Sequence, residues 1–387
     1  HGTCNRYRQN QLTYNYMGKL HFLLAVMGCL LFSASEAANP LKFYVGTFTS
    51  EGAEGIAFCM LDQEREDLSL ISVFKGIDNP NYLKISPDRK TLYAASRSPR
   101  NIDPSGGSVV AFRIGGNGSL LFLNKQSSQG EDPCYVDVSG DGRQVAVSNY
   151  GGGSVAVFPV AGDGSLLPAS SVAVHQGSGL HKSRQSRPHA HSASFSRDGQ
   201  TLFAADLGVD KLFAYTVQSP EGKLVAASPP FAELPAGSGP RHFAFSGDNR
   251  FCYVVNELAS TVTVFRNEEG IMTLIQNLST LPEDYSGESY CADIHLSPDG
   301  HFVYASNRGH NSIAVFRRED TGKLILMKTV STMGNWPRNF VIDPTGKYML
   351  VANQRSHSIT LFRLEEGTPV FTGKELSTPA PVCLEFL

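Results

Sequence analysis

A motif of about twelve residues recurs six times along the chain, and this repetition limits the possible folds more than any other feature of the sequence. The first copy reads SPDRKTLYAASR, and the copies begin at Ser86, Ser139, Ser196, Ser246, Ser297 and Asp343. Successive copies lie 53, 57, 50, 51 and 46 residues apart. A period of this length indicates an array of similar supersecondary units.

The apolar residues within each repeat alternate, which predicts β-strands and excludes a helical solenoid. In the fourth copy, HFAFS reads as a first strand, GDNR as a tight turn and FCYVVN as a second strand. TVTVFR and MTLIQNLST follow as the third and fourth strands. Four short antiparallel strands in every fifty residues are typical of a propeller blade.

Counting the second strands gives seven blades rather than six. These strands contain Tyr44, Tyr93, Val145, Phe203, Tyr253, Tyr304 and Leu350. The first of them has no first strand before it, whereas the C-terminal PAPVCLEFL matches the first strands NPNYLKIS and GPRHFAFS. We therefore expect an all-β, seven-bladed propeller over residues 39–387, closed by a C-terminal strand that joins the N-terminal blade and removes a free sheet edge.

Residues 1–38 have the pattern of upstream sequence followed by a secretory signal peptide. From Met17 the chain continues into the apolar run HFLLAVMGCLLFSA and then the small residues of SASEAANP. This predicts a secreted or periplasmic protein without a stable membrane span after processing. An uncleaved anchor, a fortuitous apolar leader and lipidation at Cys29 are the alternatives, and a misread leader would leave the protein in the cytoplasm.

Charge and cysteine patterns exclude several classes of protein. The formal net charge is −3 and no block of Lys and Arg occurs, which argues against nucleic-acid binding. Five cysteines lie beyond the leader, without CxxC spacing: Cys59, Cys134, Cys252, Cys291 and Cys383. Neither a zinc site nor a disulfide framework follows from them, and we expect no cofactor.

The start of a first strand and the end of the next strand lie at one edge of an antiparallel pair, so the repeat predicts which side chains gather at one end of the central channel. The strand-start position, five residues before the repeat marker, holds Asn81, Cys134, His191, Arg241, Ala292, Arg338 and Val382. The strand-end position holds Phe48, Arg97, Asn149, Leu207, Glu257, Arg308 and Gln354. A single carboxylate therefore stands among arginines, amides and one imidazole.

Several segments together resemble the propeller-type 6-phosphogluconolactonases, a family that also includes fungal carboxy-cis,cis-muconate cyclase. They are HAHSASFSRDG, GPRHFAF, YVVNEL, ADIHLSPDG and PRNFVIDPTGKY, and the resemblance extends from about Leu41 to the end of the chain. It implies an active site made of a His, two Arg and a Glu. The matching positions are His191, Arg241, Glu257 and Arg338.

These residue types suit the hydrolysis of a lactone. Glu257 or His191 could take a proton from the attacking water. Arg241 and Arg338 suit an oxyanion, or a phosphate or carboxylate of the substrate. No GxSxG elbow occurs and no cysteine has an evident histidine partner, so we expect no covalent intermediate. The expected substrate is an anionic sugar-acid lactone, either 6-phosphogluconolactone-like or a related aldonolactone.

Other polar residues near these positions are expected to contact the substrate: His189, His242, Asn149 and His295. His295 lies in the middle of its strand, which favours a structural role. His189 and His191 could hold a metal, but no acidic residue accompanies them, and no metal is predicted. Arg241 and Glu257 could form a purely structural ion pair.

Two further functions are compatible with the sequence. The same side chains could serve a carboxymuconate-type lactonising cyclase, and a propeller can also be a non-catalytic platform that binds proteins or ligands. An exported protein would be separated from the cytoplasmic pentose phosphate pathway, so the reaction class is better defined than the substrate. The polar segment HQGSGLHKSRQSR, residues 175–187, reads as a flexible loop or as a lid.

Overall fold

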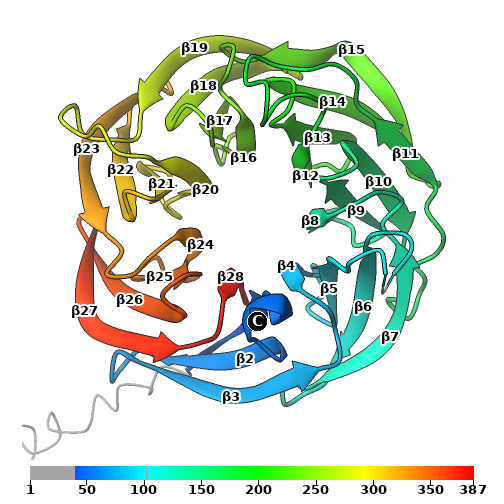
Figure 1. Ribbon diagram of the computed structural model, residues 1–387, viewed down its shortest axis with the longest axis horizontal. Helices are drawn as coiled ribbons and strands as arrows, with labels where there is room; N and C mark the ends of the chain where they lie inside the picture. The colour runs from blue at the N-terminus through cyan, green and yellow to red at the C-terminus, as the bar shows by residue number, and fades with distance from the viewer. Residues whose placement is uncertain (1–39, 102) are drawn as a thin grey trace, which may run out of the picture. The chain divides into compact units, whose positions relative to one another are not determined.

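The computed structural model describes residues 40–101 and 103–387, which form seven four-stranded antiparallel sheets arranged as blades around a channel (Figure 1). The predicted seven-bladed, all-β architecture is confirmed. Within this described part, the one helical element is the short 3-10 helix η2 (Thr49–Glu51). The predicted leader, residues 1–38, lies outside the described residues.

Six blades are each built from four consecutive strands, with the first strand innermost. In chain order, the first two of these blades are β4 (Pro80–Ile85), β5 (Thr91–Ser96), β6 (Ser108–Ile114) and β7 (Leu120–Ser127), then β8 (Pro133–Val138), β9 (Gln144–Asn149), β10 (Ser154–Pro159) and β11 (Ser171–Val174). The next two are β12 (Ala190–Phe195), β13 (Thr201–Asp206), β14 (Lys211–Gln218) and β15 (Lys223–Glu233), then β16 (Pro240–Phe245), β17 (Phe251–Asn256), β18 (Thr261–Glu268) and β19 (Ile271–Ser279). The last two are β20 (Tyr290–Leu296), β21 (Phe302–Arg308), β22 (Ser312–Arg318) and β23 (Leu324–Ser331), then β24 (Pro337–Ile342), β25 (Tyr348–Asn353), β26 (Ser358–Glu365) and β27 (Thr368–Ser377).

The remaining blade joins the two ends of the propeller. The C-terminal strand β28 (Pro381–Phe386) pairs with β1 (Leu41–Thr47), which is followed outward by β2 (Gly55–Asp62) and β3 (Asp67–Lys75) (Figure 1). Phe386 faces Phe43 across this pair, with ring centroids 5.7 Å apart. The predicted closure is confirmed, and it pairs an edge that would otherwise be free.

The apolar second strands of the repeats form the core between neighbouring blades, and every residue of β5, β9, β17 and β25 is buried. Four second-strand tyrosines also reach a turn in the next blade, where each hydroxyl donates to a glycine carbonyl 2.7–3.0 Å away: Tyr44 to Gly118, Tyr93 to Gly164, Tyr253 to Gly322 and Tyr304 to Gly367. A buried phenol needs such a partner. The recurring tyrosine therefore links one blade to the next.

The marker that defines the repeat forms the hairpin turn between the first and second strands. In the fourth copy, the Ser246 hydroxyl donates to Asp248 and accepts the backbone N–H of Phe251, at 2.6 and 3.0 Å. The copies that begin at Ser86, Ser139, Ser196 and Ser297 repeat this arrangement. The most regular part of the sequence is therefore structural, and it lies at the opposite end of the hairpin from the strand-start positions.

No helix within the described ranges is long and apolar enough to cross a membrane.

Candidate active site

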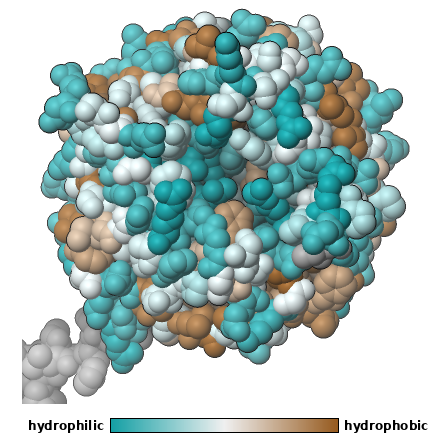
Figure 2. All heavy atoms as spheres, in the orientation of Figure 1, coloured by the Kyte–Doolittle hydropathy of each residue, from teal (hydrophilic) through white to brown (hydrophobic). Residues whose placement is uncertain are grey.

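The strand-start residues lie at irregularities in the pairing of the two innermost strands. The register shifts between Pro133 and Tyr135, Ala190 and Ser192, Pro240 and His242, and Pro337 and Asn339. These shifts leave Cys134, His191, Arg241 and Arg338 outside the regular pairing. Because a bulge redirects a side chain and ends regular pairing, it is a common device beside active sites. Figure 2 shows a hydrophilic hollow at the centre of the face drawn there.

Glu257 is a buried carboxylate contacted by three arginines, of which Arg241 and Arg308 are buried and Arg184 is partly exposed. Its carboxylate lies 3.1 Å from Arg241 Nε, 2.7 Å from Arg308 Nη2 and 2.5 Å from Arg184 Nη2. Only 6% of the Glu257 side chain is exposed. Burial alone would raise the pKa of Glu257, but the guanidinium groups of Arg308, Arg241 and Arg184 outweigh it and hold this pKa well below its usual range.

Arg241 is almost completely buried and is held from two sides. Nε donates to Glu257, while Nη1 contacts the carbonyl of Ala292 and lies 3.3 Å from His242 Nε2. Nη2 has no hydrogen-bond acceptor among the described residues. Burial and the nearby Arg308 lower the pKa of Arg241 to about 10, so the guanidinium stays charged at neutral pH. The result is an oriented cation with two donor hydrogens still available.

Arg338 is half-buried and has no carboxylate partner in the described part of the chain. Its Nη1 lies 3.5 Å from the Gln354 side-chain oxygen, and its guanidinium carbon lies 5.1 Å from the centroid of the Phe48 ring. Burial and the nearby Arg241 and Arg308 lower the pKa of Arg338 to about 9. This guanidinium therefore carries a positive charge that a ligand anion could neutralise.

His191 is a neutral imidazole at physiological pH. Burial and then Arg241 place the pKa of His191 well below its ordinary value. Its Nδ1 lies 3.8 Å from the Cys134 sulfur, whose thiol donates to the His191 carbonyl at 3.2 Å. Burial raises the pKa of Cys134 to about 12, so this cysteine stays a thiol rather than becoming a nucleophilic thiolate.

The other four residues expected to contact substrate have different surroundings. His189 stacks on Tyr150 and donates from Nδ1 to the Tyr150 carbonyl at 2.9 Å. His242 lies beside Arg241. Asn149 is fully buried and donates to Ser128 O and Ser154 Oγ, and His295 bonds to Asp293. The structure therefore brings His242 to the arginine cluster, but neither Asn149 nor His295 contacts it.

Sequence reasoning did not assign Arg184 or Arg308 to the site. Arg308 occupies the strand-end position, so the repeat register was the signal that could have found it. Arg184 belongs to segment 175–187 and has no repeat signal. Gln185 next to it is fully buried and donates to the Leu207 carbonyl and to Asp210, both at 2.8 Å. These bonds fix the segment to the blade, and Arg184 beside Gln185 reaches Glu257, which fits the lid alternative better than a flexible loop.

Fold and site together define a seven-bladed propeller in which arginines from several blades gather around one buried carboxylate. Residues 40–101 and 103–387 contain no group of three or more His, Cys, Asp or Glu side chains arranged to hold a metal ion. Guanidinium groups arranged in this way have the chemistry to bind and polarise an anionic or carbonyl-bearing small molecule.

Comparison with known proteins gives the family. Residues 42–386 match the family described as "Lactonase, 7-bladed beta-propeller". The chain belongs to this lactonase family, as its sequence motifs predict.

Three relatives illustrate the match. The chain is 39% identical over 351 residues to 6-phosphogluconolactonase of Bacillus subtilis, covering 89% of this chain and 97% of that protein. It is 35% identical to 6-phosphogluconolactonase of Formosa agariphila, covering 78% and 86%. The solved structure of a periplasmic gluconolactonase from Pseudomonas aeruginosa superposes with a TM-score of 0.85 at 35% identity, covering 90% and 99%. The predicted enzyme class, a lactone-hydrolysing carboxylic ester hydrolase, is confirmed.

Proposed function

We propose that the protein hydrolyses an anionic sugar-acid lactone, 6-phosphogluconolactone or a related aldonolactone. We place the reaction at the end of the central channel that Arg241, Arg308 and Arg338 line, which we call the arginine-lined mouth. The observation that carries this proposal is the presence of two arginines, Arg241 and Arg338, whose charges are compensated differently. Arg241 is oriented by Glu257 and has a free Nη2, while Arg338 has no carboxylate partner among the described residues. One can stabilise charge that develops during the reaction, and the other can hold charge that the substrate already has.

Hydrolysis begins with the attack of water on the ring carbonyl. The carbonyl oxygen becomes an oxyanion, which the two Nη2 hydrogens of Arg241 are placed to bind. Arg338 binds the phosphate or another anionic group of the substrate, because a guanidinium offers a planar fork of donors. The ring C–O bond then breaks, and the ring oxygen leaves as a hydroxyl after it gains a proton.

His191 suits the general base better than Glu257. Both oxygens of Glu257 are already engaged by guanidinium groups, so this carboxylate serves as their counter-ion and is not free to face the attacking water. His191 is unprotonated at neutral pH, and its Nε2 has no partner in the described residues. It takes the proton from the attacking water and returns it to the ring oxygen, without a covalent enzyme intermediate.

The relatives support the reaction and leave the choice of lactone open. Two of them carry the name 6-phosphogluconolactonase, and the Pseudomonas protein is named a periplasmic gluconolactonase. The name of the Pseudomonas protein fits the exported location that the leader predicts. An unphosphorylated aldonolactone would then be the substrate available to the protein.

A pH-stat assay against gluconolactone, 6-phosphogluconolactone and carboxymuconolactone, corrected for spontaneous hydrolysis, tests the proposal. We expect acid release from a sugar lactone. We also expect Arg338→Ala to raise KM more for the phosphorylated lactone than for the neutral one. Arg266→Ala, which removes an exposed arginine on β18, is the matched control. Absence of catalysed release from every lactone would favour the non-catalytic platform.

A further inference from the structure

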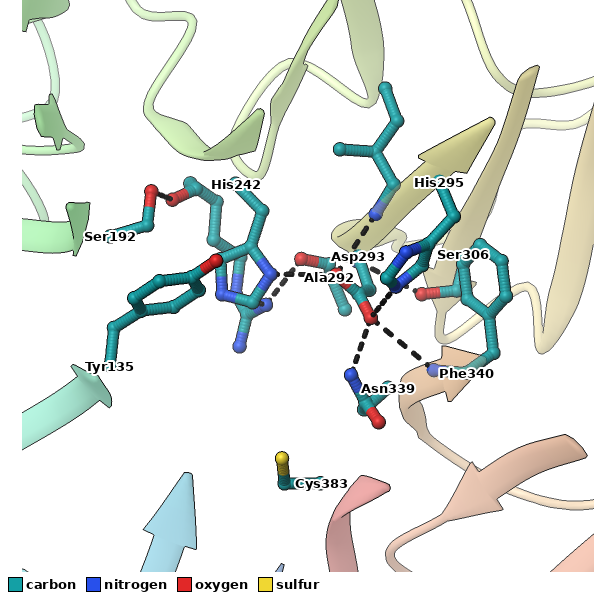
Figure 3. A network of polar contacts seen from close by, with 12 residues as sticks. Tyr135, Ser192, His242, Ala292, Asp293, His295, Ser306, Asn339, Phe340 and Cys383 are labelled. Atoms are coloured by element: carbon teal, nitrogen blue, oxygen red, sulfur yellow. Dashed lines mark hydrogen bonds and ion pairs between the residues drawn. The ribbon is translucent and has the colours of Figure 1, made fainter. Parts of the chain in front are cut away.

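A buried carboxylate lies next to the arginine cluster and contacts none of the arginines. Asp293 on β20 is 2% exposed and is surrounded by hydrogen-bond donors (Figure 3). Its Oδ1 accepts from His242 Nδ1 at 2.7 Å and Ile294 N at 3.0 Å, and its Oδ2 accepts from His295 Nε2 at 3.0 Å, Asn339 Nδ2 at 2.5 Å and Phe340 N at 3.3 Å. These five donors come from three innermost strands, β16, β20 and β24, and together they fix the carboxylate in place.

The contact with Asp293 determines which nitrogen of His242 carries hydrogen. An ionised carboxylate only accepts, so His242 Nδ1 must donate. Burial and the neighbouring Arg241 lower the pKa of His242 to about 4, so the ring is neutral and its Nε2 holds a lone pair. That nitrogen lies 3.3 Å from Nη1 of Arg241, which can only donate. The hydrogen bonds therefore run in one direction, from Arg241 to His242 to Asp293.

We propose that Asp293 and His242 are positioning residues that orient the Arg241 guanidinium for the reaction. This inference rests on the proposed role of Arg241. Glu257 holds Nε, and His242 together with the Ala292 carbonyl holds both hydrogens of Nη1. The planar guanidinium is thereby fixed, and only Nη2 is left to face the substrate.

The surroundings of His242 keep its ring in this orientation. The rings of Tyr135 and Tyr82 meet the imidazole edge to face, with centroids 5.1 and 5.7 Å away. In Asp293→Asn the amide could donate to Nδ1 and force the other tautomer, with hydrogen on Nε2. The N–H groups of His242 and Arg241 would then face each other as two donors. A carboxylate-to-amide change produces the same wrong tautomer where a carboxylate orients a catalytic histidine.

Kinetics of Asp293→Asn and His242→Gln test the proposal on the full chain. We expect kcat to fall on the order of 10²-fold in Asp293→Asn, as for a misplaced catalytic group, with a smaller change in KM. His242→Gln, whose amide offers one donor and one acceptor, should retain more activity than His242→Ala. Asp137→Asn is the control, because Asp137 is a half-buried carboxylate on another innermost strand, β8, outside this network. Unchanged kcat in Asp293→Asn would overturn the inference.

A double-mutant comparison separates positioning from general stability. If Asp293 acts through Arg241, adding Asp293→Asn to Arg241→Ala should cost no further activity. Full additivity would contradict the inference. Loss of activity in Arg241→Ala combined with normal activity in Asp293→Asn would reject the positioning role and leave the proposed function intact. Normal activity in Arg241→Ala would reject the proposed function itself.

The tautomer can also be measured in the unaltered protein, which keeps the test independent of how the variants fold. A ¹H–¹⁵N spectrum with labelled histidine should show His242 neutral at pH 7, with hydrogen on Nδ1. Hydrogen on Nε2 would overturn the inference.

Discussion

At the scale of single residues, Glu257 lies buried among Arg184, Arg241 and Arg308. We therefore expect that removing its charge destabilises the folded protein. Glu257→Gln leaves three buried or half-buried guanidinium groups without their shared counter-ion. We expect the free energy of unfolding to fall by about 3 kcal/mol, the usual consequence of breaking a buried ion pair. Urea unfolding measures this loss. A Glu257→Gln protein that is as stable as the wild type but inactive would instead support Glu257 as the general base.

The lowered pKa of His242 indicates how the stability of the protein depends on pH. The folded pKa of His242 is about 4, below the ordinary value of 6.5, so the unfolded chain binds more protons in this interval. The free energy of unfolding should therefore fall as the pH drops from about 6.5 to about 4, by on the order of 3 kcal/mol for this residue. Denaturant titrations at several pH values test this slope. His242→Gln should flatten it, and an unchanged slope in that variant would contradict the assignment.

At the scale of secondary-structure elements, the C-terminal strand carries a prediction of its own. Deleting residues 381–387 removes the strand β28, which pairs with β1 and buries Val382, Cys383 and Leu384. The ring would be open and the edge of β1 exposed, so we expect a far larger fall in unfolding temperature than an ordinary tail deletion causes. Calorimetry of the truncated protein measures it. An unchanged unfolding temperature would show that closure by β28 does not stabilise the propeller.

Strand pairing also explains which parts of the site could be predicted. The repeat register placed Arg241 at the start of the first strand and Glu257 at the end of the second strand of one inner hairpin, at the same edge of the sheet. Arg241 Nε lies 3.1 Å from Glu257 Oε2. The bulges beside Arg241 could not be predicted, because a register shift leaves no mark in the alternation of apolar residues. Asp293 was missed because it lies one residue after the strand-start position Ala292, where no other repeat has a carboxylate.

Arg184 shows the limit of reasoning from repeats. It lies in an insertion between β11 and β12 that the other blades lack, and its placement depends on bonds from Gln185 to Leu207 and Asp210. Those partners are 22 and 25 residues away in the sequence. Periodicity cannot predict contacts of this kind, and composition alone left a flexible loop and a lid as alternatives for this segment.

At the scale of the whole molecule, seven similar blades produce one asymmetric cluster of charged side chains. Five of the six hairpin turns that the repeat marker forms are nearly identical, because their Ser and Asp make the same bonds. The other end of these hairpins differs from blade to blade: one blade contributes both Arg241 and Glu257, whereas His191, Arg308 and Arg338 come from three other blades. The fold could therefore be predicted from what the repeats share, and the site from where they differ.

The turnover of Arg241→Ala on the preferred sugar lactone tests the central claim most directly. We predict that kcat falls about 10²- to 10³-fold, the loss expected when one donor to a developing oxyanion is removed, while Arg266→Ala keeps wild-type turnover. Circular dichroism confirms that both variants are folded. A folded Arg241→Ala protein with wild-type kcat would contradict catalysis at the arginine-lined mouth.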